Sequence, residues 1–157
     1  MAGAVKIVFF VEERRYLYMD HVGPYFMAGP SLEKVHKILE DAGLSEQVGD
    51  VFCIWQDDPD VTPADQLRSR VCVFASNDLV GPSSLKVDHL PPGKYANMVH
   101  EGKYEDVRED WKFFYGVWLP HSGYEVRRNV PAFEVYPGRK YDLLESKQIT
   151  ELYICLT

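Results

Sequence analysis

Residues 15–25 read RYLYMDHVGPY, and residues 94–104 read KYANMVHEGKY. Aligned at an offset of 79 positions, the two stretches share five identical residues. These are the pairs Tyr16/Tyr95, Met19/Met98, His21/His100, Gly23/Gly102 and Tyr25/Tyr104. Self-similarity at a fixed offset indicates a duplicated structural unit. We therefore interpret the chain as two copies of one unit.

The similarity extends outward in both directions. The further matches are VKI 5–7 with LKV 85–87, FCIW 52–55 with FEVY 133–136, and RVCV 70–73 with ELYI 151–154. Between them lie two apolar sets at helical spacing, Leu32, Val35, Ile38 and Leu39 in one copy and Trp111, Phe114, Val117 and Trp118 in the other. Such spacing marks the buried face of an amphipathic helix.

Each copy is thus predicted to run strand, strand, helix, strand, strand. The predicted strands are 5–10, 15–21, 50–55 and 69–75 with a helix at 29–42, then 85–90, 94–100, 131–136 and 149–156 with a helix at 105–119. Pro30 suits a first helical turn, and Gly43 suits the left-handed residue after a helix. We expect Pro120 to end the second helix.

Two such units must bury their apolar faces against each other. We predict an α+β fold in which duplicated βαββ units form one curved antiparallel sheet, with two helices on its convex face and a central ligand cleft on the other. The whole chain, 1–157, would be one domain. It would consist of repeat unit 4–76, linker 77–83 and repeat unit 84–157.

Composition and charge limit the classes of partner and the compartment that we expect for the chain. The formal charge of the 157-residue chain is −7 without a long Lys/Arg run, which argues against direct nucleic-acid binding. No apolar run reaches the eighteen or so residues that span a bilayer, and the N-terminus is interpreted as a strand, not a signal peptide. Cys53, Cys72 and Cys155 lie in apolar runs without CxxC spacing, so we expect buried, reduced thiols in a cytoplasmic protein.

Motifs for metals and cofactors are missing from the sequence. No His/Cys/Asp spacing suits zinc, and the acidic run 57–60 lacks the glycine and glutamate of a calcium loop. We therefore expect no metal and no cofactor. His21 and His100 each precede a turn glycine, and structural hydrogen bonding is the favoured role for both.

Strand alternation assigns candidate ligand-binding residues to the cleft. In the last strand Glu151, Tyr153 and Cys155 alternate with an apolar set, and Glu134 and Tyr136 share one side of strand 131–136. The full candidate set is Tyr16, Tyr18, Trp55, Tyr95, Asn97, Trp111, Trp118, Glu134, Tyr136, Glu151 and Tyr153. Packing is the alternative role for the two helical tryptophans, and a solvent-exposed edge position is the alternative for Glu151.

A carboxylate among aromatic rings has two chemical uses. It can bind a lipophilic cation, to which each ring adds about 0.5–2 kcal/mol of cation–π attraction. It can instead act as a general acid or base, because an apolar surround raises its pKa.

The ordered motifs resemble the GyrI-like small-molecule-binding family. They are HVGPY and a strand ending in DDP with TP nearby, then PPGKYA, HEG.YED, WLP.SGY, PAFEVY and TELYI, which together span residues 5–156. The family includes effector-binding domains of AraC-type and MerR-type regulators, stand-alone proteins and a gyrase-inhibiting member. The resemblance implies a duplicated βαββ fold with a central cleft. The helix-turn-helix of the regulators is not expected, because the two repeats leave no room for it.

The resemblance also implies a function. We expect a stand-alone binder of hydrophobic or cationic small molecules, with hydrolytic detoxification of strained, cyclopropane-type electrophiles as a further activity. Glu151 would then activate water, and Tyr153 or Tyr95 would hydrogen-bond the ligand carbonyl. The alternatives are a protein-interaction module of the gyrase-inhibitor type and a ligand-sensing subunit of a regulator. Arg70 departs from the acidic residue that is frequent in the family at that position.

Overall fold

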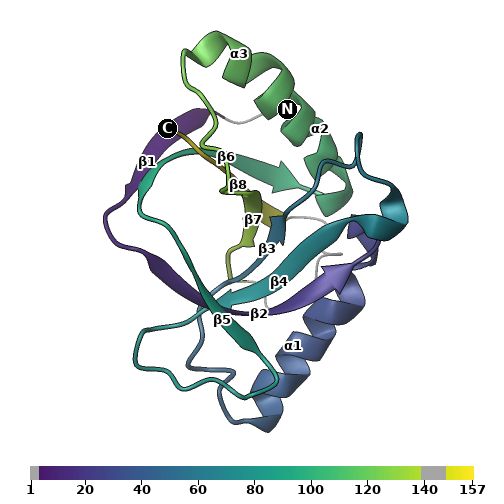
Figure 1. The fold of residues 1–157 in the computed structure, drawn as a ribbon, viewed down its shortest axis with the longest axis vertical. Coiled ribbons are helices and arrows are strands. Elements are labelled where there is room, and N and C mark those ends of the chain that lie inside the picture. Colours follow the sequence, from purple (N-terminus) through teal and green to yellow (C-terminus); the bar gives the residue numbers. More distant parts are fainter. Residues whose placement is uncertain (1–3, 139–147) are drawn as a thin grey trace.

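The structure, a computed structural model, describes residues 4–138 and 148–157 (Figure 1). The order of elements is the same in both halves of the chain. The first half contains β1 (Val5–Phe10), β2 (Arg14–Val22), α1 (Gly29–Asp41), β3 (Val51–Trp55) and β4 (Arg68–Phe74). The second contains β5 (Lys86–Leu90), β6 (Gly93–Gly102), α2 (Val107–Phe113), β7 (Ala132–Tyr136) and β8 (Gln148–Cys155). The predicted order of strands and helices is therefore confirmed.

The second helical segment is longer than predicted. After α2 the chain continues through a π-helical turn (Phe114–Trp118) into α3 (Leu119–Ser122). The prediction that Pro120 ends the helix is wrong, because Pro120 lies within α3 and the chain stays helical through Ser122. The segment ends instead at Gly123, which has a left-handed φ of 78°.

The eight strands form one antiparallel sheet in the order β1-β6-β8-β7-β3-β4-β2-β5. The two halves meet at the centre, where β3 pairs with β7. They also exchange their first strands: β1 pairs with β6 of the second half, and β5 pairs with β2 of the first. The exchange joins the halves at both edges of the sheet as well as at its centre.

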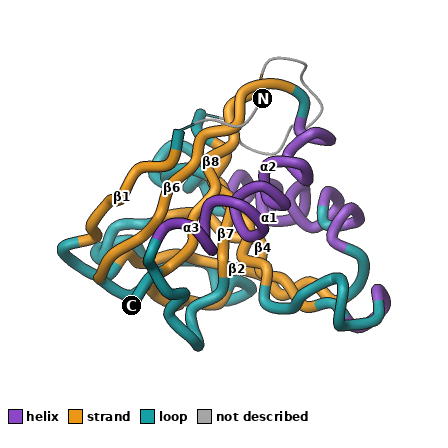
Figure 2. The backbone as a smooth tube through the Cα atoms, turned by 90° about the horizontal axis from the view of Figure 1, so that it is seen from above, coloured by secondary structure: helices purple, strands orange, loops and turns teal. Residues whose placement is uncertain are grey.

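The sheet curls, with the helices outside the curl. Figure 2 shows α1 and α2 on one side of the strands. On this outer face α1 covers one apolar core through Leu32, Val35 and Leu39, and α2 covers a second through Val107 and Trp111. The inner face carries one aromatic core to which β1, through Phe10, and β5, through Leu90, both contribute. The α+β class, with a curved sheet and two helices on one face, is therefore confirmed.

Local predictions at glycine and cysteine positions are also confirmed. Gly23 and Gly102, equivalent in the two halves, have φ values of 129° and 126°, and Gly43 after α1 has φ of 72°. A side chain would be strained at these angles, which explains the glycines. The three cysteines are free and buried.

Candidate functional site

The most enclosed charged group of the outer face is the carboxylate of Glu134 on β7. Its side chain is 3% exposed. Oε1 accepts a hydrogen bond from Trp111 Nε1 at 2.5 Å, and Oε2 accepts one each from the hydroxyls of Tyr104 and Tyr136 at 2.7 Å. We call these four residues the Glu134 cluster.

Three elements assemble this cluster. β7 supplies Glu134 and Tyr136, which alternation places on one face of the strand. Tyr104 comes from a short 3₁₀ turn (Tyr104–Asp106) that follows β6, and Trp111 comes from α2. Tyr104 packs against both outer cores, so the cluster lies at the seam between the two halves.

The hydrogen bonds suit an ionised carboxylate. The indole N–H can only donate, and the two short hydroxyl contacts to the other oxygen complete an all-donor set. Burial, with the nearby Glu134 charge, holds the pKa of Tyr104 well above its ordinary value, so this hydroxyl stays a donor. Within residues 4–138 and 148–157, Glu134 forms no ion pair with a basic side chain. Among the described residues, the hydrogen-bond partners of this carboxylate are therefore neutral donors.

Aromatic rings connect the cluster to the surface. Tyr115, 43% exposed, stacks on Trp111 with ring centroids 5.7 Å apart and an interplanar angle of 20°. Burial of its hydroxyl, with a smaller contribution from Asp58, raises the pKa of Tyr115 to about 12. Trp55, also on the outer face, packs against Tyr25 at 4.6 Å. A ligand approaching Glu134 along Trp111 would therefore meet aromatic faces.

A second carboxylate lies on the inner face. Burial is the main cause that raises the pKa of Glu151 on β8, and the charge of Asp50 adds to it. Its neighbour Tyr153 stacks on Phe133 at 4.7 Å, and burial raises the pKa of Tyr153 to about 12. The Tyr95 hydroxyl donates to the carbonyl of Pro91 at 2.7 Å, and this side chain is fully buried.

The structure divides the predicted site residues between the two faces. The inner set is Tyr16, Tyr18, Tyr95, Asn97, Glu151 and Tyr153, and the outer set is Trp55, Trp111, Trp118, Glu134 and Tyr136. The prediction of one cleft containing both glutamates is corrected by the register of β7 on β8. Glu134 lies opposite Leu152, which faces α2, whereas Glu151 lies opposite Val135 of the inner core.

Two residues of the outer site were missed. Tyr104 is the last residue of the repeated 11-residue motif, and its identity with Tyr25 could have singled it out. Tyr115 has no such signal. On the inner face Arg70, noted for its unusual identity, donates to Asp88 and to the Tyr16 hydroxyl at 2.8 Å each and lies over the Tyr18 ring. Arg70 is thus tied into the inner wall.

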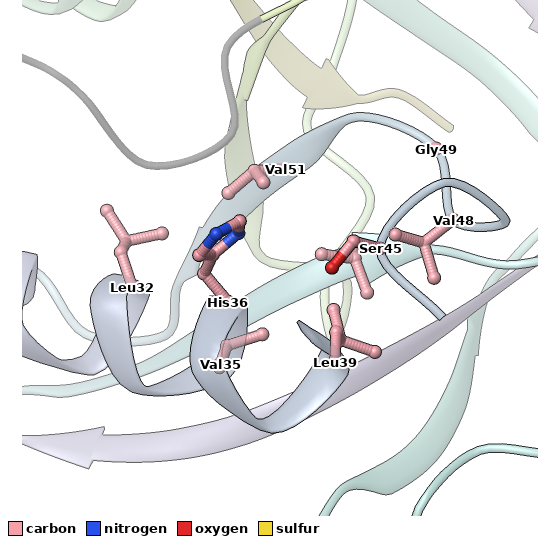
Figure 3. A pocket seen from close by; sticks show the side chains of 9 residues that line it. Leu32, Val35, His36, Leu39, Ser45, Val48, Gly49 and Val51 are labelled. Carbon is pink, nitrogen blue, oxygen red and sulfur yellow. The ribbon is translucent and has the colours of Figure 1, made fainter. Parts of the chain in front are cut away.

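A small apolar cavity lies elsewhere, between α1 and β3 (Figure 3). Its volume is about 50 Å³, and Leu32, Leu39, Val51 and the hydroxyl of Ser45 line it. Binding sites for drug-sized ligands occupy about 300–1,000 Å³. This cavity is therefore too small to be such a site.

The described residues contain no group of three His, Cys, Asp or Glu side chains arranged for a metal ion. Across the same residues, the helices are too short and too polar for a membrane span.

The curled antiparallel sheet, with helices on its outer face (Figure 2), places the chain in the class of α+β domains. More narrowly, the GyrI-like small molecule binding domain family matches residues 5–156, and the chain belongs to this family. A relative named DNA gyrase inhibitor, from Erwinia billingiae, is 27% identical over 129 residues, which cover 80% of this chain and 81% of the relative.

Solved structures share the fold at low sequence identity. The C-terminal domain of EcmrR superposes with a TM-score of 0.73 at 14% identity, covering 100% of this chain and 99% of that one. SAV2435 bound to tetraphenylphosphonium gives a TM-score of 0.65 at 14% identity, with 98% and 94% covered. A hydrolase from Listeria innocua gives 0.65 at 11% identity, with 99% and 92% covered. These likenesses show the fold alone.

Proposed function

We propose that this protein binds lipophilic organic cations at the Glu134 cluster. The observation that carries the proposal is a buried carboxylate whose hydrogen-bond partners, among residues 4–138 and 148–157, are all neutral donors. A buried charge without a counter-charge is costly, and an incoming cation would offset that cost.

Aromatic surroundings favour the same class of ligand. A delocalised cation attracts the faces of Tyr and Trp rings and loses little hydration when it leaves water. Trp111 and the half-exposed Tyr115 stacked on it provide such faces beside Glu134. The tetraphenylphosphonium bound by SAV2435, a protein of the same fold, is a ligand of this kind.

Titration calorimetry with tetraphenylphosphonium tests the proposal. Glu134→Gln keeps the shape of the side chain and removes its charge. We expect it to weaken binding by about tenfold to a hundredfold, since a hydrogen bond or contact to a charged group contributes about 1.5–3 kcal/mol. Triphenylphosphine oxide, a neutral triaryl probe, should bind both proteins equally.

Glu151→Gln is the matched control, because it removes the half-buried carboxylate that lies on the opposite face of the same sheet. It should leave tetraphenylphosphonium affinity unchanged. Equal affinities for wild type and Glu134→Gln would refute the proposal. A loss confined to Glu151→Gln would move the binding site to the inner face.

Hydrolysis at Glu151 is a second candidate function. Its raised pKa suits a general base near neutral pH, the neighbouring Tyr153 could hydrogen-bond a ligand carbonyl, and a hydrolase has the same fold. Glu151 would take a proton from a water molecule whose oxygen bonds to a ring carbon of the strained cyclopropane. The ring C–C bond would break, its electron pair would pass to the conjugated carbonyl of the ligand, and protonation of that enolate would complete the addition of water. Product formation should stop in Glu151→Gln and persist in Glu134→Gln; saturable binding without any product would exclude the activity.

The name of the Erwinia relative supports a third candidate, a protein-interaction module that binds DNA gyrase. A supercoiling assay with purified gyrase and increasing amounts of this protein tests it directly. Undiminished supercoiling at a large molar excess would rule the interaction out.

A further inference from the structure

We propose that His100 is a positioning residue for the Glu134 cluster, and that it acts through a proton shared with Asp110. The proposal deepens the proposed function, because it identifies what holds the ligand site in shape. Part of its test is independent of any ligand.

The imidazole of His100 uses both of its nitrogens. Nδ1 lies 2.7 Å from Oδ2 of Asp110 on α2, and Nε2 lies 2.9 Å from the carbonyl oxygen of Lys103 in the turn after β6. Both His100 and Asp110 are 5% exposed. One ring therefore ties the end of β6 to the turn and to the helix.

The two residues that His100 contacts are sequence neighbours of the two residues outside β7 that donate hydrogen bonds to Glu134. Lys103 immediately precedes Tyr104, and Asp110 immediately precedes Trp111. Tyr104 donates to Oε2 of Glu134, and Trp111 donates to Oε1. The imidazole thus fixes the backbone on which each donor is mounted, so a shift of either anchor moves a donor away from the carboxylate.

The two contacts require an extra proton. A neutral imidazole donates from one nitrogen only, yet both neighbours of this ring are acceptors, a carboxylate and a carbonyl. The pair must therefore hold one proton on Nε2 and a second between Nδ1 and Oδ2. Among the described residues, Asp110 is the charged group in contact with the ring, and Thr150 lies opposite His100 in the register of β8. Loss of the shared proton would set two acceptors against each other.

The first half of the chain contains the same arrangement around His21, with a serine hydroxyl in place of the carboxylate. His21 Nε2 lies 3.3 Å from the carbonyl of Pro24, three residues on, and its Nδ1 lies 3.4 Å from Oγ of Ser31, ten residues on. The spacings equal those of His100, but the contacts are longer and a hydroxyl replaces the carboxylate. The arrangement that includes the Asp110 carboxylate is found in the half that contains the buried Glu134.

The ligand-free test follows the indole N–H signal of Trp111 by NMR, with signals of the three tryptophans assigned by substitution. His100→Gln places an amide near the position of Nε2 but loses the contact to Asp110. We expect the Trp111 signal to move toward that of a water-exposed indole. His21→Gln, the matched change in the other half, should leave this signal in place, and circular dichroism should show both variants folded.

The second test measures tetraphenylphosphonium affinity in two variants of the pair. In Asp110→Asn the amide can donate to Nδ1 while Nε2–H donates to Lys103, so both contacts persist without the extra proton. This variant should bind within about threefold of wild type, whereas His100→Gln should bind about tenfold more weakly.

The outcomes separate this proposal from the proposed function. If the wild type does not bind the probe, the proposed function fails and the Trp111 signal alone decides the role of His100. An unchanged Trp111 signal in folded His100→Gln, or a loss of affinity in Asp110→Asn as large as that in His100→Gln, would overturn the positioning role.

Discussion

Glu134 and Glu151 lie in neighbouring strands of the same half of the chain, yet they occupy different surroundings. Glu134 is enclosed on the outer face and satisfied by three donors. Glu151 is half-buried on the inner face near the acidic side chain of Asp50. The first carboxylate is held in place by hydrogen-bond donors, whereas burial makes the charged form of the second less favourable.

The raised pKa of Glu151 predicts how stability depends on pH. Because the folded state binds the Glu151 proton more tightly than the unfolded chain does, this group favours folding below its ordinary pKa, and that contribution is lost as pH rises through the folded value. At pH 7 the charged side chain is therefore a net penalty. Glu151→Gln should unfold at higher urea concentration than wild type at pH 7, and the difference should shrink below about pH 4.

Urea unfolding at several pH values, followed by circular dichroism, gives this comparison. Glu12→Gln, which changes an exposed glutamate in the β1–β2 loop, is the control for the loss of one negative charge. A Glu151→Gln variant that is less stable than wild type at pH 7 would show that Glu151 stabilises the fold as an anion.

At the scale of elements, the helical segment 107–122 combines α2, a π-helical turn and α3. Extra residues in a π turn shift the side chains that follow, and such turns are common near functional sites. Here Trp111 lies in α2, before the π turn, and Tyr115 lies within the turn. The two rings stack on each other beside Glu134. Gly123 then ends the segment in a left-handed conformation.

Two glycines of this segment should respond oppositely to alanine. Gly123→Ala should destabilise the protein by about 1–2 kcal/mol, the cost of a left-handed L-residue, because a Cβ there meets open space and only the backbone is strained. Gly116→Ala, within the helical segment and also free of contacts, should be neutral or stabilising by up to about 1 kcal/mol. Chemical denaturation measures both, and equal effects would contradict the capping role of Gly123.

At the scale of the molecule, the exchange of first strands makes each half depend on the other. β1 finds its partner in β6, and β5 finds its partner in β2. A half on its own would expose the unpaired edge of its second strand and the apolar side chains of the shared inner core.

We therefore expect neither residues 1–80 nor residues 81–157 to fold as a monomer. Each fragment should lack a cooperative thermal transition by circular dichroism, and an equimolar mixture should recover one. Analytical ultracentrifugation shows whether a fragment that folds alone has paired with a copy of itself. A cooperative transition in a monomeric fragment would contradict this view of the exchange.

The division of the chain into repeat units 4–76 and 84–157 stays a prediction. What the structure adds is that equivalent elements of the two halves have equivalent neighbours. His21 and His100, predicted to form structural hydrogen bonds, do so in both halves. The halves differ in chemistry. Among the described residues, the second half surrounds the buried carboxylate of Glu134 with hydrogen-bond donors, whereas the first half has Cys53 at the position paired with Glu134 across β3 and β7.

The amino-acid sequence by itself determined the elements, their order, the turn glycines and the alternation of side chains within each strand, because each of these depends on spacing over a few residues. Alternation says which residues of a strand share a face, but not which face of the sheet that is. Only the cross-strand register decided that Glu134, opposite Leu152, joins Trp111 outside while Glu151 faces inward. Register depends on which distant strands pair, and that choice is made by the packing of the whole sheet.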